Sequence, residues 1–317
     1  MQPLDDLLHH LQRLRKPLIL GHESADPDAV ASALGLNFLI GGKIAFPSLS
    51  REGKVLIEHS GLPYELMPRV DGYDVVVVDT NQREMLGGID LSRARSVTVV
   101  DHHTTPATIE GTLFIYPDYT STSEVVARLI LQARQEIPHK LREILLAGIL
   151  FDTKSLYLAK KETLSLVSKL LPQGRTVADI HSLFYSPKDI SERIARLKAL
   201  RKGRIIRYGD YLLVVTDAGS FEASVANVIV SAGADAAIAY GKEKKIGRVS
   251  LRASPRFLKE IGPLTAFVEN NEECGGHEGA VGCHCDPEVC ENLVERIKER
   301  ILKKLKGKLG PQVLREY

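Results

Sequence analysis

The chain has 317 residues, of which 44% are hydrophobic and 26% charged, as in a globular protein with room for two domains. Its net charge of +2 is too small to favour or exclude nucleic acid as a partner. No apolar run reaches the ~18 residues of a membrane span, and the first residues lack the basic and apolar regions of a signal peptide. We therefore expect a cytoplasmic protein with no membrane partner.

The first half of the chain alternates helical segments with short apolar ones, which is typical of an α/β domain with a parallel sheet. Its four consecutive valines at 75–78 predict a strand buried on both faces, hence a central one. Asp26 is the expected N-cap of the second helix, with Pro27 at the first helical position. We expect strands at 17–21, 43–48, 73–79, 96–100 and 113–116, and helices at 4–15, 29–40, 123–136, 139–151, 161–171 and 176–184.

The pattern changes where a Ser-Pro pair at 186–187 interrupts the helical segments. We expect a first domain at 1–186, a linker helix at 187–203 and a smaller second α/β domain at 204–317. The tail from Gly307 is expected to fray. In the second domain the patterns predict hairpins from 204–207 with 211–216 and from 234–240 with 246–253, helices at 221–232 and 263–270, a Gly-rich stretch at 275–282, and a closing helix at 287–306.

Two features of the second domain leave alternatives open. The four cysteines, at 274, 283, 285 and 290, lie within 17 residues but form no C-x-x-C pair. Reduced thiols or a local disulfide are therefore favoured over a zinc site. The closing helix is rich in Lys and Arg, but Glu295 and Glu299 interrupt the run, which favours a solvated face over a nucleic-acid track.

Acidic and imidazole side chains end the expected strands and helices of the first domain. They are His22, Asp26, Asp28, Asp79, Asp101, His102, His103 and Asp152. The carboxyl ends of parallel strands share one edge, so these groups should converge there. So many buried carboxylates are unfavourable unless cations accompany them, and carboxylate with imidazole suits Mn²⁺, Mg²⁺ or Fe²⁺. The first loop lacks G-x-G-x-x-G, which argues against a dinucleotide site.

The motifs resemble those of the DHH phosphoesterases. His22-x-x-x-Asp26-x-Asp28, the strand-end Asp79, Asp101-His102-His103 and the segment 148–153 are similar to the family's four motifs in order. In the second domain, Arg252-Ala253-Ser254 and Gly275-Gly276-His277 resemble the R-x-S and G-G-H motifs of the DHHA1 domain. The size and layout are similar to the NrnA-like oligoribonuclease branch and to small archaeal single-strand exonucleases.

The resemblance implies roles for these residues. Two divalent cations are implied, Mn²⁺ in the first place and Mg²⁺ as the alternative. His22 and Asp26 would hold one, Asp28, His102 and Asp152 the other, and Asp79 would bridge them. His103 would contact the scissile phosphate, while Asp101 would orient a histidine. In the second domain, Arg252, Ser254 and His277 would bind substrate phosphates, with Gly275 and Gly276 letting the backbone approach.

The resemblance therefore implies a two-metal phosphodiesterase, an exonuclease that releases nucleotides from short or single-stranded RNA or DNA held between the domains. One alternative is a phosphodiesterase of linear or cyclic dinucleotides, or a phosphoadenosine-phosphate phosphatase. Another is an inactive nucleic-acid-binding scaffold, which the intact motifs disfavour. Pyrophosphatases of this kind carry a different second domain. We expect a homo-oligomer, with a protein partner in nucleic-acid processing as a further possibility. DNA or RNA preference and polarity stay open.

Overall fold

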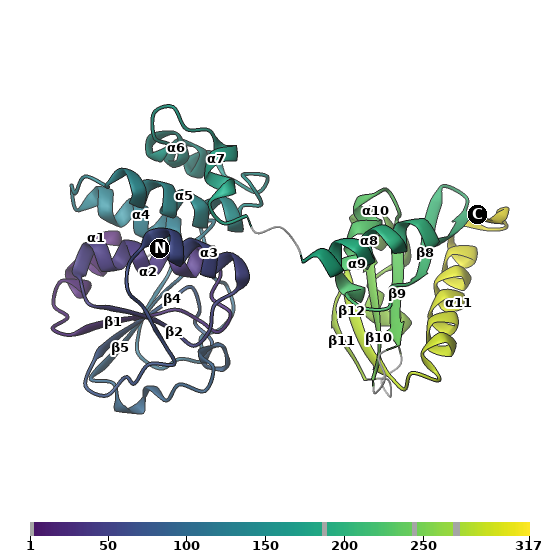
Figure 1. Ribbon diagram of the computed structural model, residues 1–317, viewed down its shortest axis with the longest axis horizontal. Helices are drawn as coiled ribbons and strands as arrows, with labels where there is room; N and C mark the ends of the chain where they lie inside the picture. The colour runs from purple at the N-terminus through teal and green to yellow at the C-terminus, as the bar shows by residue number, and fades with distance from the viewer. Residues whose placement is uncertain (1–2, 186–188, 243–245, 269–272) are drawn as a thin grey trace. The chain divides into compact units, whose positions relative to one another are not determined.

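The computed structural model describes residues 3–185, 189–242, 246–268 and 273–317. The chain divides into two compact units, 1–186 and 187–317, and each is described by itself (Figure 1). None of the helices within the described ranges combines the length and the apolar character needed to cross a bilayer.

The first unit contains a parallel sheet whose strands follow the order β3-β2-β1-β4-β5-β6. Every neighbouring pair runs parallel. All five residues of β4 are buried, and β4 lies between β1 and β5, so the prediction of a central strand is confirmed. The strands are β1 (Pro17–Leu20), β2 (Lys43–Phe46), β3 (Glu65–Leu66), β4 (Asp74–Val78), β5 (Ser96–Asp101) and β6 (Thr112–Ile115).

Helices cover one face of this sheet (Figure 1). Alternate strand residues such as Val76 and Val78 pack against them, whereas Val75 and Val77 face a smaller core with Leu86. The helices are α1 (Leu4–Leu11), α2 (Pro27–Ile40), α3 (Arg51–Ser60), α4 (Thr122–Gln132), α5 (His139–Asp152), α6 (Lys161–Leu170) and α7 (Val177–Ser182). The α/β class expected from the sequence is confirmed.

The second unit contains a mixed sheet in the order β11-β12-β10-β9-β8-β7-β13. Only β8 and β9 pair in parallel among its described strands. Both hairpins predicted from the sequence are present, although the turn at 243–245 lies outside the described residues. The strands are β7 (Arg204–Tyr208), β8 (Tyr211–Asp217), β9 (Ala236–Lys242), β10 (Gly247–Ala253), β11 (Cys274–His277), β12 (Ala280–Cys285) and β13 (Leu314–Glu316).

Helices lie on both faces of the second sheet. They are α8 (Ile190–Lys202), α9 (Glu222–Ser231), α10 (Pro255–Ile261) and α11 (Cys290–Leu309). Helix α8, expected as a linker, packs within this unit, because Ala195 and Ala199 join the core formed by α9 and Ala237. On the other face, Ile297 and Ile301 of α11 pack against Leu251.

Three expectations for the second unit were wrong or incomplete. The helix expected at 263–270 is only a 3₁₀ turn, η3 (Leu264–Phe267), and residues 269 and 270 lie outside the described part. The Gly-rich stretch forms the β11–β12 hairpin. The tail does not fray at Gly307: α11 continues to Leu309, and β13 then pairs with β7. The Tyr208 hydroxyl donates to the Gly310 carbonyl at 2.6 Å, a contact that fastens this tail.

Candidate metal centre and substrate face

The acidic and imidazole residues of the first unit meet at the carboxyl edge of its sheet. His22 follows β1, Asp79 follows β4, and Asp101 is the last residue of β5. The backbone of Asp79 has a φ of 62°, in the left-handed region that costs an L-residue about 1–2 kcal/mol. Its side chain is nonetheless buried, so the turn after β4 directs this carboxylate into the edge rather than into solvent.

Three groups of possible ligands overlap at Asp79, and the third of them joins it to His102 and His103. His22, Asp26 and Asp79 offer ligand atoms that all lie within 4.8 Å of one another. The same holds for the four residues of the second group, which are Asp28, Asp79, His102 and Asp152. Oδ2 of Asp79 lies 3.6 Å from Nε2 of His22, and its Oδ1 lies 3.7 Å from Nε2 of His102. The two oxygens of one carboxylate therefore face different histidines.

Hydrogen bonds determine which nitrogen each histidine presents. His22 Nδ1 lies 2.8 Å from the Glu23 carbonyl oxygen, which can only accept, so Nδ1 carries the hydrogen and Nε2 keeps its lone pair toward Asp79. Asp101 Oδ1 accepts from the His102 backbone nitrogen at 2.8 Å and pairs with His103 Nδ1 at 2.7 Å. That pairing raises the pKa of His103. The His103 side chain is half exposed.

The start of α4 holds two of the carboxylates, a contact that the sequence analysis missed. Asp28 accepts from the backbone nitrogens of Thr122 at 2.7 Å and Ser123 at 2.8 Å, and from the Ser123 hydroxyl. A helix N-terminus favours such a negative charge. The Thr122 hydroxyl donates to Asp79 Oδ1 at 2.9 Å. A carboxylate has about four lone pairs, so both acids retain capacity for a cation.

The electrostatics of the edge fit divalent cations. Burial raises the pKa of Asp79 well above its usual range, and the surrounding carboxylates of Asp28, Asp26, Asp152 and Asp101 raise it further. Burial alone would lower the pKa of His102, but Asp152 and Asp28 raise it to about 9. His102 Nε2 lies 3.1 Å from Asp152 Oδ2 without the alignment of a hydrogen bond. Oxygen and imidazole donors together suit Mn²⁺ or Mg²⁺, and a cation would relieve this repulsion.

In the second unit, two of the three residues expected to bind phosphate share one row of the sheet. Arg252 of β10 is directly opposite Ala280 of β12, which is directly opposite His277 of β11. Directly paired residues project to the same face. The Arg252 guanidinium donates to Asn227 Oδ1 at 3.1 Å and to the Leu251 carbonyl at 2.7 Å, and burial lowers its pKa. It has no carboxylate partner within the described ranges, which suits an anionic ligand.

The remaining motif residues have structural roles here. Ser254 caps α10 and accepts from the Phe257 nitrogen at 3.2 Å. Gly276 has a φ of 148°, and a Cβ there would lie 2.1 Å from the Ala280 carbonyl oxygen, so the hairpin itself requires glycine. At Gly275 a Cβ would meet nothing within 4 Å, so that glycine leaves bare backbone on the sheet.

The four cysteines form two local disulfides. Cys274 pairs with Cys283, its directly opposite residue on β12, and Cys285 pairs with Cys290. The first of these links the two strands of the hairpin that carries His277. Of the two favoured interpretations, the structure therefore has the local disulfide.

Comparison with known proteins identifies a family for the first unit. The model of the DHH family N-terminal domain matches residues 16–149. An uncharacterized protein of Methanocaldococcus jannaschii is 31% identical over 98% of both chains. The cyclic-di-AMP phosphodiesterase GdpP of Geobacillus thermodenitrificans is 26% identical, over 61% of this chain and 33% of its own length.

Among solved structures, the fold is similar to that of an exopolyphosphatase-related protein from Bacteroides fragilis. The TM-score is 0.72 at 20% identity, and the match covers 95% of this chain and 97% of the other. The similarity thus extends over both units and supports the two-domain α/β architecture.

Proposed function

This chain belongs to the DHH phosphoesterase superfamily and is a metal-dependent phosphoesterase, and on that premise we propose that it releases nucleotides from short or single-stranded nucleic acid. The observation that carries the proposal is the Asp79 carboxylate, whose two oxygens face His22 and His102. This arrangement suits Asp79 as a ligand shared by two cations. His22 and Asp26 complete one position, and the remaining ligands are Asp28, His102 and Asp152.

Two bound divalent cations would supply Lewis-acid stabilisation of phosphate charge and a water of lowered pKa. The chain's own residues bind and orient the phosphate. Asp101 fixes the ring of His103 through Nδ1. In the protonated ring, Nε2 of His103 is then the atom that donates a hydrogen bond to a phosphate oxygen, and the pairing with Asp101 raises the pKa of the ring, which favours that form.

The second unit contributes substrate binding in this proposal. The Arg252 guanidinium, half-buried and without a carboxylate partner among the described residues, matches the planar fork that binds phosphate oxygens. His277 projects from the same face, with only the Ala280 methyl in the row between them. A substrate with several phosphates can engage such a face while one phosphodiester lies at the metal centre, which favours oligonucleotides over a single small phosphate ester.

A second candidate is hydrolysis of linear or cyclic dinucleotides. The likeness to GdpP favours it, because that relative is by name a cyclic-di-AMP phosphodiesterase and its match covers 61% of this chain. The same metal centre and the same Arg252 face would serve a substrate with two phosphates, so the two candidates differ only in the length of chain that is bound.

A substrate panel distinguishes these candidates. The purified protein with Mn²⁺ is assayed against 5′-labelled and 3′-labelled RNA and DNA oligomers, linear and cyclic dinucleotides, phosphoadenosine phosphate, pyrophosphate and polyphosphate. We expect the highest kcat/KM for oligomers, with mononucleotides accumulating from one end. An Asp79→Ala preparation purified in parallel controls for contaminating nucleases. Preference for cyclic dinucleotides would support the second candidate, and activity confined to pyrophosphate or polyphosphate would contradict both.

A further inference from the structure

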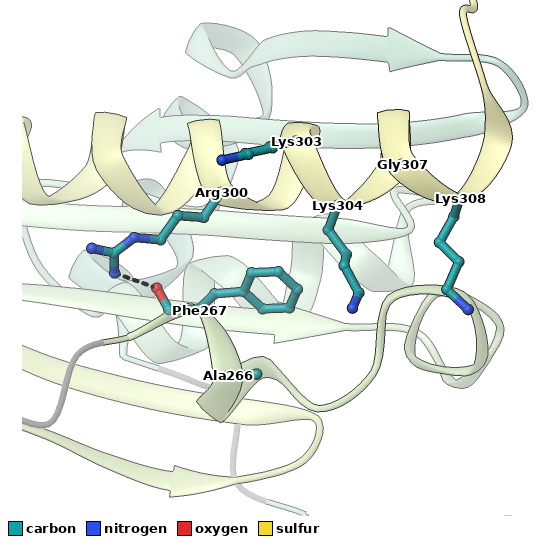
Figure 2. A pocket seen from close by; sticks show the side chains of 7 residues that line it. All are labelled: Ala266, Phe267, Arg300, Lys303, Lys304, Gly307 and Lys308. Atoms are coloured by element: carbon teal, nitrogen blue, oxygen red, sulfur yellow. Dashed lines mark hydrogen bonds between the residues drawn. The ribbon is translucent and has the colours of Figure 1, made fainter.

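A pocket in the second unit lies away from the row of Arg252 and His277. It has a volume of about 480 Å³, within the range of ligand sites, and lies between η3 and the C-terminal half of α11. Figure 2 shows Lys304 and Lys308 extending from α11 toward the side of Ala266 and Phe267. Neither a Glu nor an Asp is among the described residues that line it.

Four cationic residues of α11 line the pocket. Three of them, Arg300, Lys304 and Lys308, are four residues apart and so lie on one side of the helix, and Lys303 is the fourth. Arg300 donates to the Phe267 carbonyl oxygen at 3.0 Å (Figure 2). Lys304 and Lys308 have no carboxylate partner among the described residues, whereas Lys298, outside the pocket, pairs with Glu295. The pocket therefore contains two ammonium groups, those of Lys304 and Lys308, that no carboxylate of the described residues neutralises.

Gly307 supplies an independent observation. It lies within α11, where glycine is less favourable than alanine, and the helix is capped by Gly310 rather than by Gly307. A Cβ at Gly307 would meet nothing within 4 Å, so packing does not require glycine either. Its absent side chain instead leaves the helix backbone bare along the wall of the pocket, between Lys304 and Lys308.

We propose that this pocket binds the phosphate backbone of a single-stranded nucleic acid, at nucleotides other than those at the metal centre. The inference rests on the proposed function, since it assigns a second contact to the same substrate. The ammonium groups of Lys304 and Lys308 bind successive phosphates as point charges, and bare backbone at Gly307 lets the chain approach. Lys304 and Lys308 of α11 then bind the nucleic acid, while the other basic residues of this helix form a solvated face.

The test uses the full chain in chelator, so that a dye-labelled single-stranded oligothymidylate is bound without hydrolysis. Affinity is measured by fluorescence anisotropy across a series of salt concentrations. The variants are Lys304→Gln, Lys308→Gln and Gly307→Ala. Lys306→Gln is the matched control, because Lys306 lies in the same turn but does not line the pocket. Lys306 and the two pocket lysines all lie in the last turns of α11, where a positive charge interacts favourably with the helix dipole. Lining of the pocket is therefore the difference between the control and the test variants.

We expect each pocket lysine variant to lower the slope of log affinity against log salt by about 0.7, which is about fivefold weaker binding at about 0.1 M salt. Lys306→Gln should change affinity less than about twofold, as an exposed, screened charge would. Gly307→Ala should weaken binding while raising the melting temperature, a combination that general loss of structure cannot produce.

Equal effects of Lys304→Gln and Lys306→Gln would overturn the inference, as would binding of inorganic polyphosphate in place of the oligonucleotide. Hydrolysis of oligonucleotides is measured separately with Mn²⁺. If the unmodified protein hydrolyses them and the pocket variants bind normally, only this inference fails. If the unmodified protein neither binds nor hydrolyses nucleic acid, both the inference and the proposed function fail.

Discussion

Arg252 and His277 project from the same face of the second sheet, each directly opposite Ala280 on the strand between them. Neighbouring strands are about 4.8 Å apart, so the two backbones are separated by roughly 10 Å, and the small alanine leaves the space between them open. The two residues are 25 positions apart in sequence, and only the pairing of β10, β12 and β11 brings them into one row.

This row predicts a difference between large and small substrates. Under the proposed function, Arg252→Ala and His277→Ala would each remove a hydrogen bond to a charged phosphate, so kcat/KM on an oligonucleotide should fall about 10- to 100-fold. Hydrolysis of a minimal aryl phosphodiester, which makes few remote contacts, should fall much less. Steady-state rates for both substrates, with metal content checked, measure this.

Arg248→Ala is the matched control, since Arg248 lies on the same strand and faces the same side, opposite His284. It should leave both rates near those of the unmodified protein. Equal losses on both substrates in the Arg252 and His277 variants would place these residues in the chemical step. Unchanged rates on both substrates would show that the Gly-Gly-His motif has only a structural role, as a turn.

Local patterns predicted the elements of the first unit well. The valines of β4 and the Asp26-Pro27 start of α2 are signals that act within a few residues, and both appear as expected. Helix α3 and strand β3 were not predicted: α3 has a polar sequence with Gly53 inside it, and β3 has only two residues. In the second unit, β13 pairs with β7, which lies more than a hundred residues earlier in the chain. A local sequence pattern does not predict such a distant contact.

In the candidate site, too, local sequence predicted the residues but not their distant contacts. The motif order predicted which acids and histidines to examine, but it gave no indication that the start of α4 lies beside them. Thr122 donates to Asp79, and the Thr122 and Ser123 nitrogens donate to Asp28, across more than forty and more than ninety positions respectively. The run Thr120 to Glu124, polar at a helix start, was the one signal available, and it is equally typical of an ordinary cap.

Thr122 is therefore predicted to position Asp79. Thr122→Val keeps the shape but removes the hydroxyl, and loss of such a supporting contact weakens metal binding about 10- to 100-fold. Thr122→Ser should restore most of the affinity because it restores the donor. Mn²⁺ titration by calorimetry measures this. Unchanged affinity in the valine variant would show that the hydroxyl does not orient the carboxylate.

Asp74, at the opposite end of β4 from Asp79, is predicted to govern acid stability. Nε of Arg95 donates to the Asp74 carboxylate at 2.8 Å, and this hydrogen bond lowers the pKa of Asp74. Hydrogen bonds from Ser96 and from the backbone nitrogens of Arg15 and Lys16 lower that pKa further. Its folded pKa is thus below its unfolded value of about 3.9, so its stabilisation is present above about pH 4 and is lost as pH falls further.

Asp74→Asn should accordingly lower the unfolding free energy by about 1–3 kcal/mol at neutral pH, and the difference should shrink toward pH 3. Urea unfolding at several pH values measures this. Asp71→Asn is the control, because its pair with Arg93 is exposed and contributes about 0–1 kcal/mol. A difference that stays constant with pH would show that packing, rather than charge, explains the loss.

The central claim is that Asp79 is shared by two cations, and equilibrium dialysis against Mn²⁺ followed by elemental analysis tests it most directly. The unmodified chain should bind two Mn²⁺, and chelator should abolish phosphodiester hydrolysis until Mn²⁺ is returned. Asp79→Ala should bind at most one ion and lose nearly all activity, while circular dichroism shows the fold retained. Full activity of the Asp79→Ala variant in metal-stripped buffer, or two tightly bound ions in that variant, would contradict the account.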